Sequence, residues 1–280
     1  MKPAKALITS ANPADKHLPL QTIVDAKGET KTPLQILLDE IFAAGLESAA
    51  VVIAPGETES YREAAGPHAD KVEFIVQSEP RGYGHAIVSA RDFTGGDPFL
   101  LLVGDHLFRS YTEKNCLEQI LEVAEKEEAT ISGVQPTRES HLNLYGTVSA
   151  SLIPGSKGLF DVSKIVEKPT PTLAEQELFV PGLRAGRYLC FFGMHVLPAR
   201  AMDLLSDQLA SLSPGESLGL TATLNHLANS GKYLALQING KRFNLGRRYG
   251  ILRAQLDLSL AGPHRDEVMA MIIETLASEG

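Results

Sequence analysis

Cysteine is scarce in this chain of 280 residues, which has only Cys116 and Cys190. Two cysteines cannot build the disulfide framework of a small secreted domain or a cysteine-rich zinc site. Both lie in apolar or helical surroundings, so we expect buried, reduced thiols.

Positive charge is also scarce. The chain carries 26 lysine and arginine residues against 34 aspartate and glutamate residues, a formal net charge of −8, and it has no long basic run. Proteins grip nucleic-acid backbones through many cationic contacts, so we expect no nucleic-acid partner. Any anionic ligand has to be held by a few placed basic residues or by backbone amides.

Long apolar runs are missing as well. No run approaches the roughly 18 residues that span a bilayer, and the three apolar residues after Lys5 are too few for the core of a signal peptide. We therefore expect no membrane partner and a cytoplasmic protein.

What the first half does contain is an alternation of short apolar runs with helical patterns. Over residues 34–42 the apolar spacings are those of one helix face, and Gly45 is placed to end that helix. Near-continuous apolar strands between helices indicate a parallel sheet with helices on both faces. We predict strands over 6–8, 49–53, 74–76, 99–103 and 129–134, and helices over 34–42 and 117–124.

The second half is less regular and predicts some antiparallel strands, so the fold class is α/β with a mixed sheet. The strand candidates lie at 148, 162–166, 188–194 and 233–238. Helical patterns cover 199–210, 220–229, 251–260 and 266–277. The last two helices are candidates for packing against a second subunit of a homo-oligomer.

Asp105 directly follows the buried run at 99–103. A carboxylate in this position lies in the crevice where open α/β sheets bind ligands. Mg²⁺ prefers one or two such carboxylates together with substrate phosphates. The alternative is an aspartate that only caps a turn or helix. His106 beside it is interpreted as a loop histidine.

Three further segments have both a functional and an ordinary interpretation. Glycines at 82 and 84 open a helix and allow close approach of a base or phosphate, although such pairs are common in turns. Glu167 and Lys168 end a strand and could bind a sugar hydroxyl and a phosphate, or be solvated charges. The four cations at 241–242 and 247–248 could hold a polyphosphate or form an exposed loop.

These pieces, in this order, resemble the bacterial UTP–glucose-1-phosphate uridylyltransferases of the sugar-nucleotide transferase superfamily. The similarity covers nearly the whole chain. It rests on residues 6–20 and 33–45, Gln77 with 81–86, Gly104-Asp105, Tyr145-Gly146, Val-Glu-Lys-Pro at 166–169, and 215–221. The resemblance implies a Rossmann-like three-layer αβα nucleotidyltransferase fold with a mixed central sheet. It also implies one domain, with a nucleotide-binding half (1–135), a sugar-phosphate-binding half (136–249) and C-terminal helices (250–280).

The resemblance also implies a reaction. A sugar 1-phosphate oxygen attacks the α-phosphorus of UTP with the help of Mg²⁺, and pyrophosphate leaves as UDP-glucose forms. By analogy with the family, the catalytic residues are Lys16, Asp105 and Lys168, and the metal ligands are Asp105 and Asn244. The nucleotide would be bound by Ala11, Asn12, Gln77, Gly82 and Asp105, and the sugar phosphate by Gly146, Glu167, Lys168 and Arg248.

The chain departs from the family on its triphosphate side. The signature loop Gly-x-Gly-Thr-Arg is replaced by residues 12–16, Asn-Pro-Ala-Asp-Lys. Pro13 removes an amide donor, and Asp15 brings negative charge to a place where the triphosphate is expected. A later segment with a catalytic lysine is deleted, and Asn244 stands where the family has a metal-binding aspartate. Two hypotheses follow: an active uridylyltransferase with an altered triphosphate grip, or a catalytically impaired sugar-nucleotide-binding or regulatory homologue.

Overall fold

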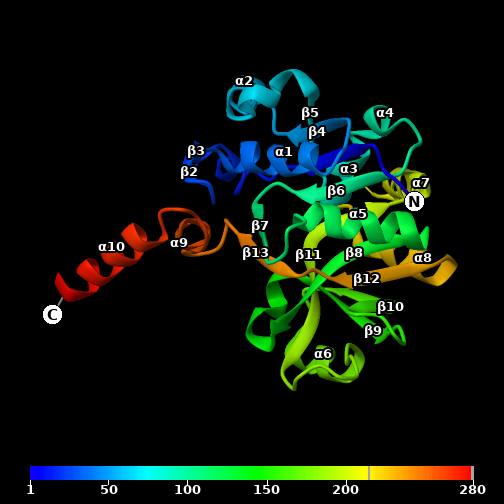
Figure 1. The fold of residues 1–280 in the computed structure, drawn as a ribbon. Helices are drawn as coiled ribbons and strands as arrows, with labels where there is room; N and C mark the ends of the chain where they lie inside the picture. The colour runs from blue at the N-terminus through cyan, green and yellow to red at the C-terminus, as the bar shows by residue number, and fades with distance from the viewer. Residues whose placement is uncertain (214, 279–280) are drawn as a thin grey trace.

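A nine-stranded mixed sheet forms the centre of the protein (Figure 1). The computed structural model describes residues 1–213 and 215–278. The strand order is β5-β4-β1-β6-β11-β8-β12-β10-β9. The bounds are β1 Lys5–Thr9, β4 Ser48–Ile53, β5 Val72–Val76, β6 Phe99–Val103, β8 Thr130–Arg138, β9 Gly146–Leu152, β10 Leu159–Glu167, β11 Arg187–Leu197 and β12 Tyr233–Gln237.

Parallel and antiparallel pairs divide this sheet. Strands β1, β4, β5 and β6 pair in parallel. Strand β11 runs antiparallel between β6 and β8, and β9 and β10 form an antiparallel pair at the far edge. The predicted mixed sheet is confirmed, and the predicted strands lie where the sequence placed them, with ends that differ by a few residues.

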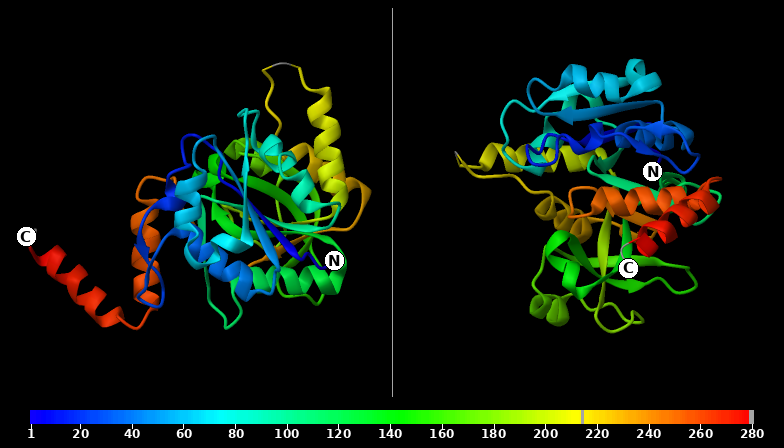
Figure 2. Two further views of the ribbon diagram at one scale, coloured as in Figure 1. Left: turned by 90° about the horizontal axis from the view of Figure 1, so that it is seen from above. Right: turned by 90° about the vertical axis from the view of Figure 1, so that its left-hand side faces the viewer.

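Helices cover both faces, which makes three layers (Figure 2). Because side chains alternate along a strand, Ala6 and Ile8 join one core while Leu7 joins the other. The first core includes α1 (Pro33–Ala43), α2 (Thr58–Ala64) and α5 (Cys116–Glu127). The second includes α3 (Tyr83–Val88), α7 (Ala199–Ser211) and α8 (Thr221–Ser230).

Local sequence explains where the main helices begin and end. Thr32 accepts a hydrogen bond from the Gln35 amide at the start of α1, and Gly45 beyond its end has a φ of 86°. Asn115 and Glu118 form a capping box at the start of α5. The remaining helices are α4 (Arg91–Thr94), α6 (Pro171–Glu177), α9 (Gly250–Ala261) and α10 (Arg265–Ser278), and 3₁₀ turns cover Leu18–Leu20, Gly66–Lys71 and Glu139–Leu144.

Two small ribbons were not predicted from the sequence. Strands β7 (His106–Ser110) and β13 (Gly240–Asn244) pair antiparallel, with Asn244 opposite His106. The second ribbon joins β2 (Ile23–Val24) to β3 (Thr30–Lys31). The first ribbon includes Lys241 and Arg242, so this part of the basic segment lies in regular structure. Its two strands lie 130 or more residues apart in the sequence, so their pairing leaves no local signal.

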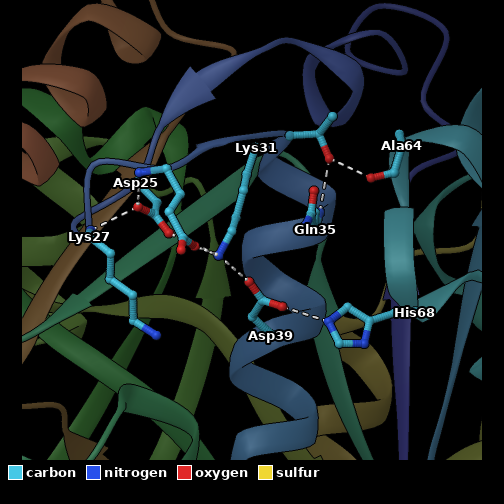
Figure 3. A network of polar contacts seen from close by, with 9 residues as sticks. Asp25, Lys27, Lys31, Gln35, Asp39, Ala64 and His68 are labelled. Carbon is cyan, nitrogen blue, oxygen red and sulfur yellow. Dashed lines mark hydrogen bonds and ion pairs between the residues drawn. The ribbon is translucent and has the colours of Figure 1, made fainter.

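A charged network anchors the β2–β3 ribbon to α1 (Figure 3). The Lys31 ammonium lies 3.1 Å from Asp25 Oδ2 and 3.0 Å from Asp39 Oδ2, and Asp39 also meets His68. These contacts hold the segment that follows the residue 12–16 loop against the body of the protein.

Helix α10 lies apart from the rest of the fold. It has no buried residue, and Figures 1 and 2 show it extending away from the sheet and its helices. No helix in residues 1–213 and 215–278 is long and apolar enough to cross a membrane.

Candidate functional site

A cleft of about 710 Å³ opens at the ends of the central strands. It is bordered by the segments that follow β1, β5, β6 and β10, which is where open α/β sheets bind ligands. Of the eleven site residues predicted from the sequence, nine line it: Ala11, Asn12, Gln77, Gly82, Asp105, Gly146, Glu167, Lys168 and Asn244. Lys16 and Arg248 are not in its wall.

One end of the cleft is built by Gln77 and the start of α3. Gln77 Nε2 donates to the Gly82 carbonyl at 3.2 Å and lies 2.8 Å from His85 Nδ1. Gly82 has a φ of 96°, and a Cβ there would come within 2.6 Å of the Leu218 carbonyl oxygen. Glycine is therefore required by both the backbone and the close neighbour.

The segment around Leu218 is fixed to this loop by backbone hydrogen bonds. The Leu218 amide donates to the Arg81 carbonyl, and the Gly84 amide donates to the Leu218 carbonyl, both at 2.8 Å. Gln77, Gly82 and Leu218 together line this end of the cleft, the Gln77–Gly82 slot.

The opposite end is built by the β9–β10 pair. Glu167 is the register partner of Gly146, and the Lys168 amide donates to the Tyr145 carbonyl at 3.2 Å. A Cβ on Gly146 would come within 2.6 Å of the Phe191 ring and 3.0 Å of Glu167 Oε2. Glycine at 146 therefore lets Phe191 and the Glu167 carboxylate pack directly against the backbone. Thr221 Oγ1 donates to that carboxylate at 3.4 Å.

Asp105 lies between the two ends, after β6. Its Oδ1 lies 2.8 Å from His106 Nδ1. Burial alone would raise the pKa of this carboxyl, but His106 and Arg242 outweigh that effect and the pKa is lowered. Asp105 is therefore ionised at neutral pH. The Leu245 amide donates to its backbone carbonyl at 2.8 Å, which keeps the end of β13 beside it.

The loop at 12–16 closes on itself. The Asn12 carbonyl accepts from the amides of Asp15 (3.0 Å) and Lys16 (2.9 Å), and Asn12 Oδ1 accepts from the Ala14 amide at 3.3 Å. Pro13 has no amide hydrogen to give. The amides that a glycine-rich loop would turn toward phosphates are thus used within the loop or absent.

Lys16 does not point into the cleft, because its ammonium pairs with the Glu57 carboxylate. The Tyr61 hydroxyl donates to the Lys16 carbonyl at 2.6 Å and holds the backbone there. Arg248 likewise lies outside the cleft, with its guanidinium over the Tyr249 ring at 5.4 Å. Sequence reasoning could not foresee either placement, because both depend on tertiary neighbours.

The basic segment at 241–248 divides into two groups. Arg242 and Arg247 line the cleft, whereas Lys241 pairs with Asp257. The Arg242 guanidinium stacks on the Tyr145 ring at 3.5 Å, and Arg242 is 7% exposed. Its Nε and Nη1 have no hydrogen-bond partner within the described part of the chain. Arg242 lies two residues before Asn244 in β13, so a strand assignment would have put both on one face.

Two histidines line the cleft beyond what the sequence predicted. His106 is buried against Asp105 and is no simple loop histidine. His195 projects from β11 beyond a bulge at Gly193, whose φ is 95°. Its Nδ1 lies 2.6 Å from Ser132 Oγ, and burial lowers its pKa to about 4, so it is neutral at pH 7.

The sequence model of the family described as "Nucleotidyl transferase" matches residues 24–250. The chain belongs to the nucleotidyl transferase family. The match begins after the residue 12–16 loop.

Relatives of similar sequence and solved structures of similar fold are also nucleotidyl transferases. A Streptococcus pyogenes protein named UTP–glucose-1-phosphate uridylyltransferase 1 is 28% identical over 95% of this chain and 90% of its own length. A Streptococcus pneumoniae protein named UTP–glucose-1-phosphate uridylyltransferase is 26% identical over 97% of this chain and 94% of its own. Among solved structures, the UTP-bound UGPase from Acinetobacter baumannii has a TM-score of 0.74 at 22% identity, over 98% of this chain and 99% of that one. A UDP-glucose pyrophosphorylase complexed with UDP-glucose has a TM-score of 0.73 at 21% identity, over 91% and 97%.

The donor set in the cleft fits a small hard cation. No three His, Cys, Asp or Glu side chains in residues 1–213 and 215–278 form a group that could hold a metal. Asp105 and Asn244 nevertheless offer carboxylate and amide oxygens from neighbouring elements. Mg²⁺ binds through one or two carboxylates and takes further ligands from water and substrate phosphates, so it fits such a site.

Proposed function

We propose that this nucleotidyl transferase forms UDP-glucose and pyrophosphate from UTP and glucose 1-phosphate. The observation that carries the proposal is one cleft with the Gln77–Gly82 slot at one end, the Gly146–Glu167–Lys168 corner at the other and Asp105 between them. The curated relatives bear the name of this activity.

The nucleotide half of the cleft takes the uracil and the ribose. Gln77 and the backbone at Gly82 are the groups that meet the base, and Ala11 and Asn12 lie at the mouth beside β1. The Gln77 side-chain oxygen can accept from the N3–H of uracil, while Gln77 Nε2 stays bonded to Gly82 and His85. The same pair also suits thymine, so the sugar-nucleotide product is tested with both bases.

The sugar half binds the hexose 1-phosphate. The Glu167 carboxylate accepts from sugar hydroxyls, and the Lys168 ammonium meets the phosphate, with its Nζ 3.9 Å from Glu167 Oε1. Gly146 lets the Phe191 ring and the Glu167 carboxylate lie close together in this corner. Arg242 and Arg247 add positive charge to the cleft wall near the phosphates.

The reaction requires positioning and charge neutralisation more than covalent chemistry from the protein. An oxygen of the sugar phosphate forms a bond to the α-phosphorus of UTP, and the bond to the pyrophosphate oxygen breaks. Asp105 and Asn244 would hold a Mg²⁺ ion, which when bound neutralises phosphate charge. Lys168 and Arg242 supply cations of the protein itself. Lys16 reaches the phosphates only if it leaves Glu57.

A second candidate function has its own observation. The closed loop at 12–16 consumes the amide donors that would cradle a triphosphate. This favours a homologue that binds a sugar nucleotide with little or no turnover, as a regulatory or binding protein.

One pair of measurements separates the two. Pyrophosphate release is followed with UTP or dTTP, glucose 1-phosphate and Mg²⁺, and calorimetry measures the binding of UDP-glucose and of UTP. Turnover with Mg²⁺-dependent UTP binding supports the enzyme. UDP-glucose binding with no UTP binding, and no turnover with any nucleotide and sugar phosphate at high protein concentration, supports the second candidate and overturns the first.

A further inference from the structure

The loop that lost its glycines gained a carboxylate, Asp15, which lines the same cleft as Asp105 and Asn244. One of its oxygens is already occupied, because Asn12 Nδ2 donates to Asp15 Oδ2 at 2.5 Å. The other oxygen, Oδ1, is turned toward the end of β13. Asp15 is thus held in one orientation, as a ligand-bearing carboxylate is held by its neighbours.

Gly246 shows how close Asp15 comes to Asn244. A Cβ on Gly246 would lie 2.9 Å from Asp15 Oδ1 and 3.4 Å from Asn244 Oδ1. Two oxygens from segments about 230 residues apart therefore border the same small space, and the absence of a side chain at 246 keeps it open.

Asp105 adjoins this pair. It precedes His106, the register partner of Asn244, and it lines the same cleft as Asp15. All three oxygens are hard donors of the kind that Mg²⁺ selects.

A second and independent feature of the cleft indicates an anionic partner for that cation. Arg242 is buried in the wall of this cleft, and its Nε and Nη1 have no hydrogen-bond partner within the described part of the chain. A guanidinium in a cleft that also holds two carboxylates matches a ligand that carries both charges, a divalent cation on a phosphate.

We infer that Asp15 supplies the second carboxylate ligand of the divalent cation, in the place where Asn244 offers only an amide oxygen. The inference rests on the proposed function, because it assigns a ligand to the cation which that function uses.

The test is direct cation binding by the purified full-length protein, with Mn²⁺ as the probe and free Mn²⁺ measured by electron paramagnetic resonance. Asp15→Asn keeps an oxygen that can accept from Asn12 and removes only the charge. We expect it to weaken Mn²⁺ binding roughly tenfold or more. Asn244→Asp in that background restores affinity to within a few-fold of wild type, because it returns a carboxylate to the site. Asp207→Asn, an exposed carboxylate on α7, is the matched control and leaves binding unchanged.

Three outcomes would overturn the inference: no Mn²⁺ binding by the wild-type protein, wild-type affinity in Asp15→Asn, or a double variant that binds no better than Asp15→Asn. Should Asp15→Asn fail to fold, as judged by circular dichroism, Asp15→Ser takes its place, because serine also keeps an oxygen that can accept from Asn12. It is expected to weaken Mn²⁺ binding in the same way, and wild-type affinity in this variant contradicts the assignment.

The result is separable from the proposed function. If the protein makes UDP-glucose but Mn²⁺ affinity does not depend on residue 15, only this inference is wrong. If Mn²⁺ affinity changes as expected but the protein neither turns over nor binds UDP-glucose, the proposed reaction is wrong and the cation site remains.

Discussion

Asp105 is a charged carboxylate in the wall of the cleft. It is ionised despite its burial because His106 and Arg242 stabilise its charge. Its position directly after β6 was predictable from the sequence, since a carboxylate after a buried parallel strand lies at the ligand-binding edge. The contribution of its two basic neighbours was not, because both come from ribbon strands that the sequence did not reveal.

Asp105→Asn is expected to reduce turnover on the order of 100-fold or more, because a neutral amide is a poor ligand for a cation that neutralises phosphate charge. The fold should persist, since asparagine keeps an oxygen facing His106. Pyrophosphate release and thermal unfolding measure the two effects. Unchanged turnover in a folded variant would contradict the role of Asp105.

Gly146→Ala is expected to act on the sugar phosphate more than on the nucleotide. The added Cβ meets the Phe191 ring and Glu167 Oε2, which costs about 1–3 kcal/mol of stability and displaces the carboxylate. The KM for glucose 1-phosphate should rise more than the KM for UTP. Gly231→Ala is the control, because the nearest atom to its Cβ is 3.8 Å away. Equal changes in both KM values would argue against a sugar site at Gly146.

Of the eleven site residues that the resemblance predicts, nine line one cleft, and Lys16 and Arg248 do not. Most of the nine lie on strand ends or within two residues of them, where backbone topology fixes the side chain's position. Lys16 has a long, flexible side chain in a loop, so its nearest carboxylate, Glu57, decides its direction. A local sequence pattern holds no information on that partner.

At the scale of elements, the regular strands and helices were predictable because their apolar periods are strong. The β7–β13 ribbon was not, since its pairing joins residues 106–110 to 240–244. Its register nevertheless determines the site, because it brings Asn244 opposite His106 and turns Arg242 toward Tyr145.

Helix α1 carries near its end a half-buried glutamate, Glu40, with a buried carboxylate oxygen. Glu40 Oε2 has no hydrogen-bond partner among residues 1–213 and 215–278. Burial, followed by the charges of Asp39 and Glu118, raises the pKa of Glu40 from 4.5 to about 8. The folded protein thus holds a proton that the unfolded chain releases. The stability that this proton provides is complete below pH 4.5 and is lost as the pH rises through about 8.

Glu40→Gln removes this titration. The free energy of unfolding of the variant, relative to wild type, is expected to increase between pH 4.5 and 8 by at most about 1.4 kcal/mol for each pH unit. Urea titrations at pH 5 and 8 measure the difference. Asp207→Asn serves as the control, and a difference that does not change with pH would contradict the assignment.

At the scale of the whole molecule, α10 is separate from the cooperative core. It buries no residue, and Met271, Ile273 and Leu276 are exposed. Removing the chain from Arg265 onward is expected to change the free energy of unfolding by less than about 1 kcal/mol. Denaturant unfolding monitored by circular dichroism tests this, and a large loss of stability would show that α10 supports the fold. The homo-oligomer expected from these C-terminal helices stays a prediction.

The short segment at 217–221 touches both ends of the cleft. Leu218 is bonded to Arg81 and Gly84 beside the base slot, and Thr221 reaches Glu167 beside the sugar corner. A ligand that displaces this segment at one end of the cleft therefore also changes its contacts at the other end. The two ligands should consequently be coupled, and by thermodynamic reciprocity each should change the other's affinity by the same factor.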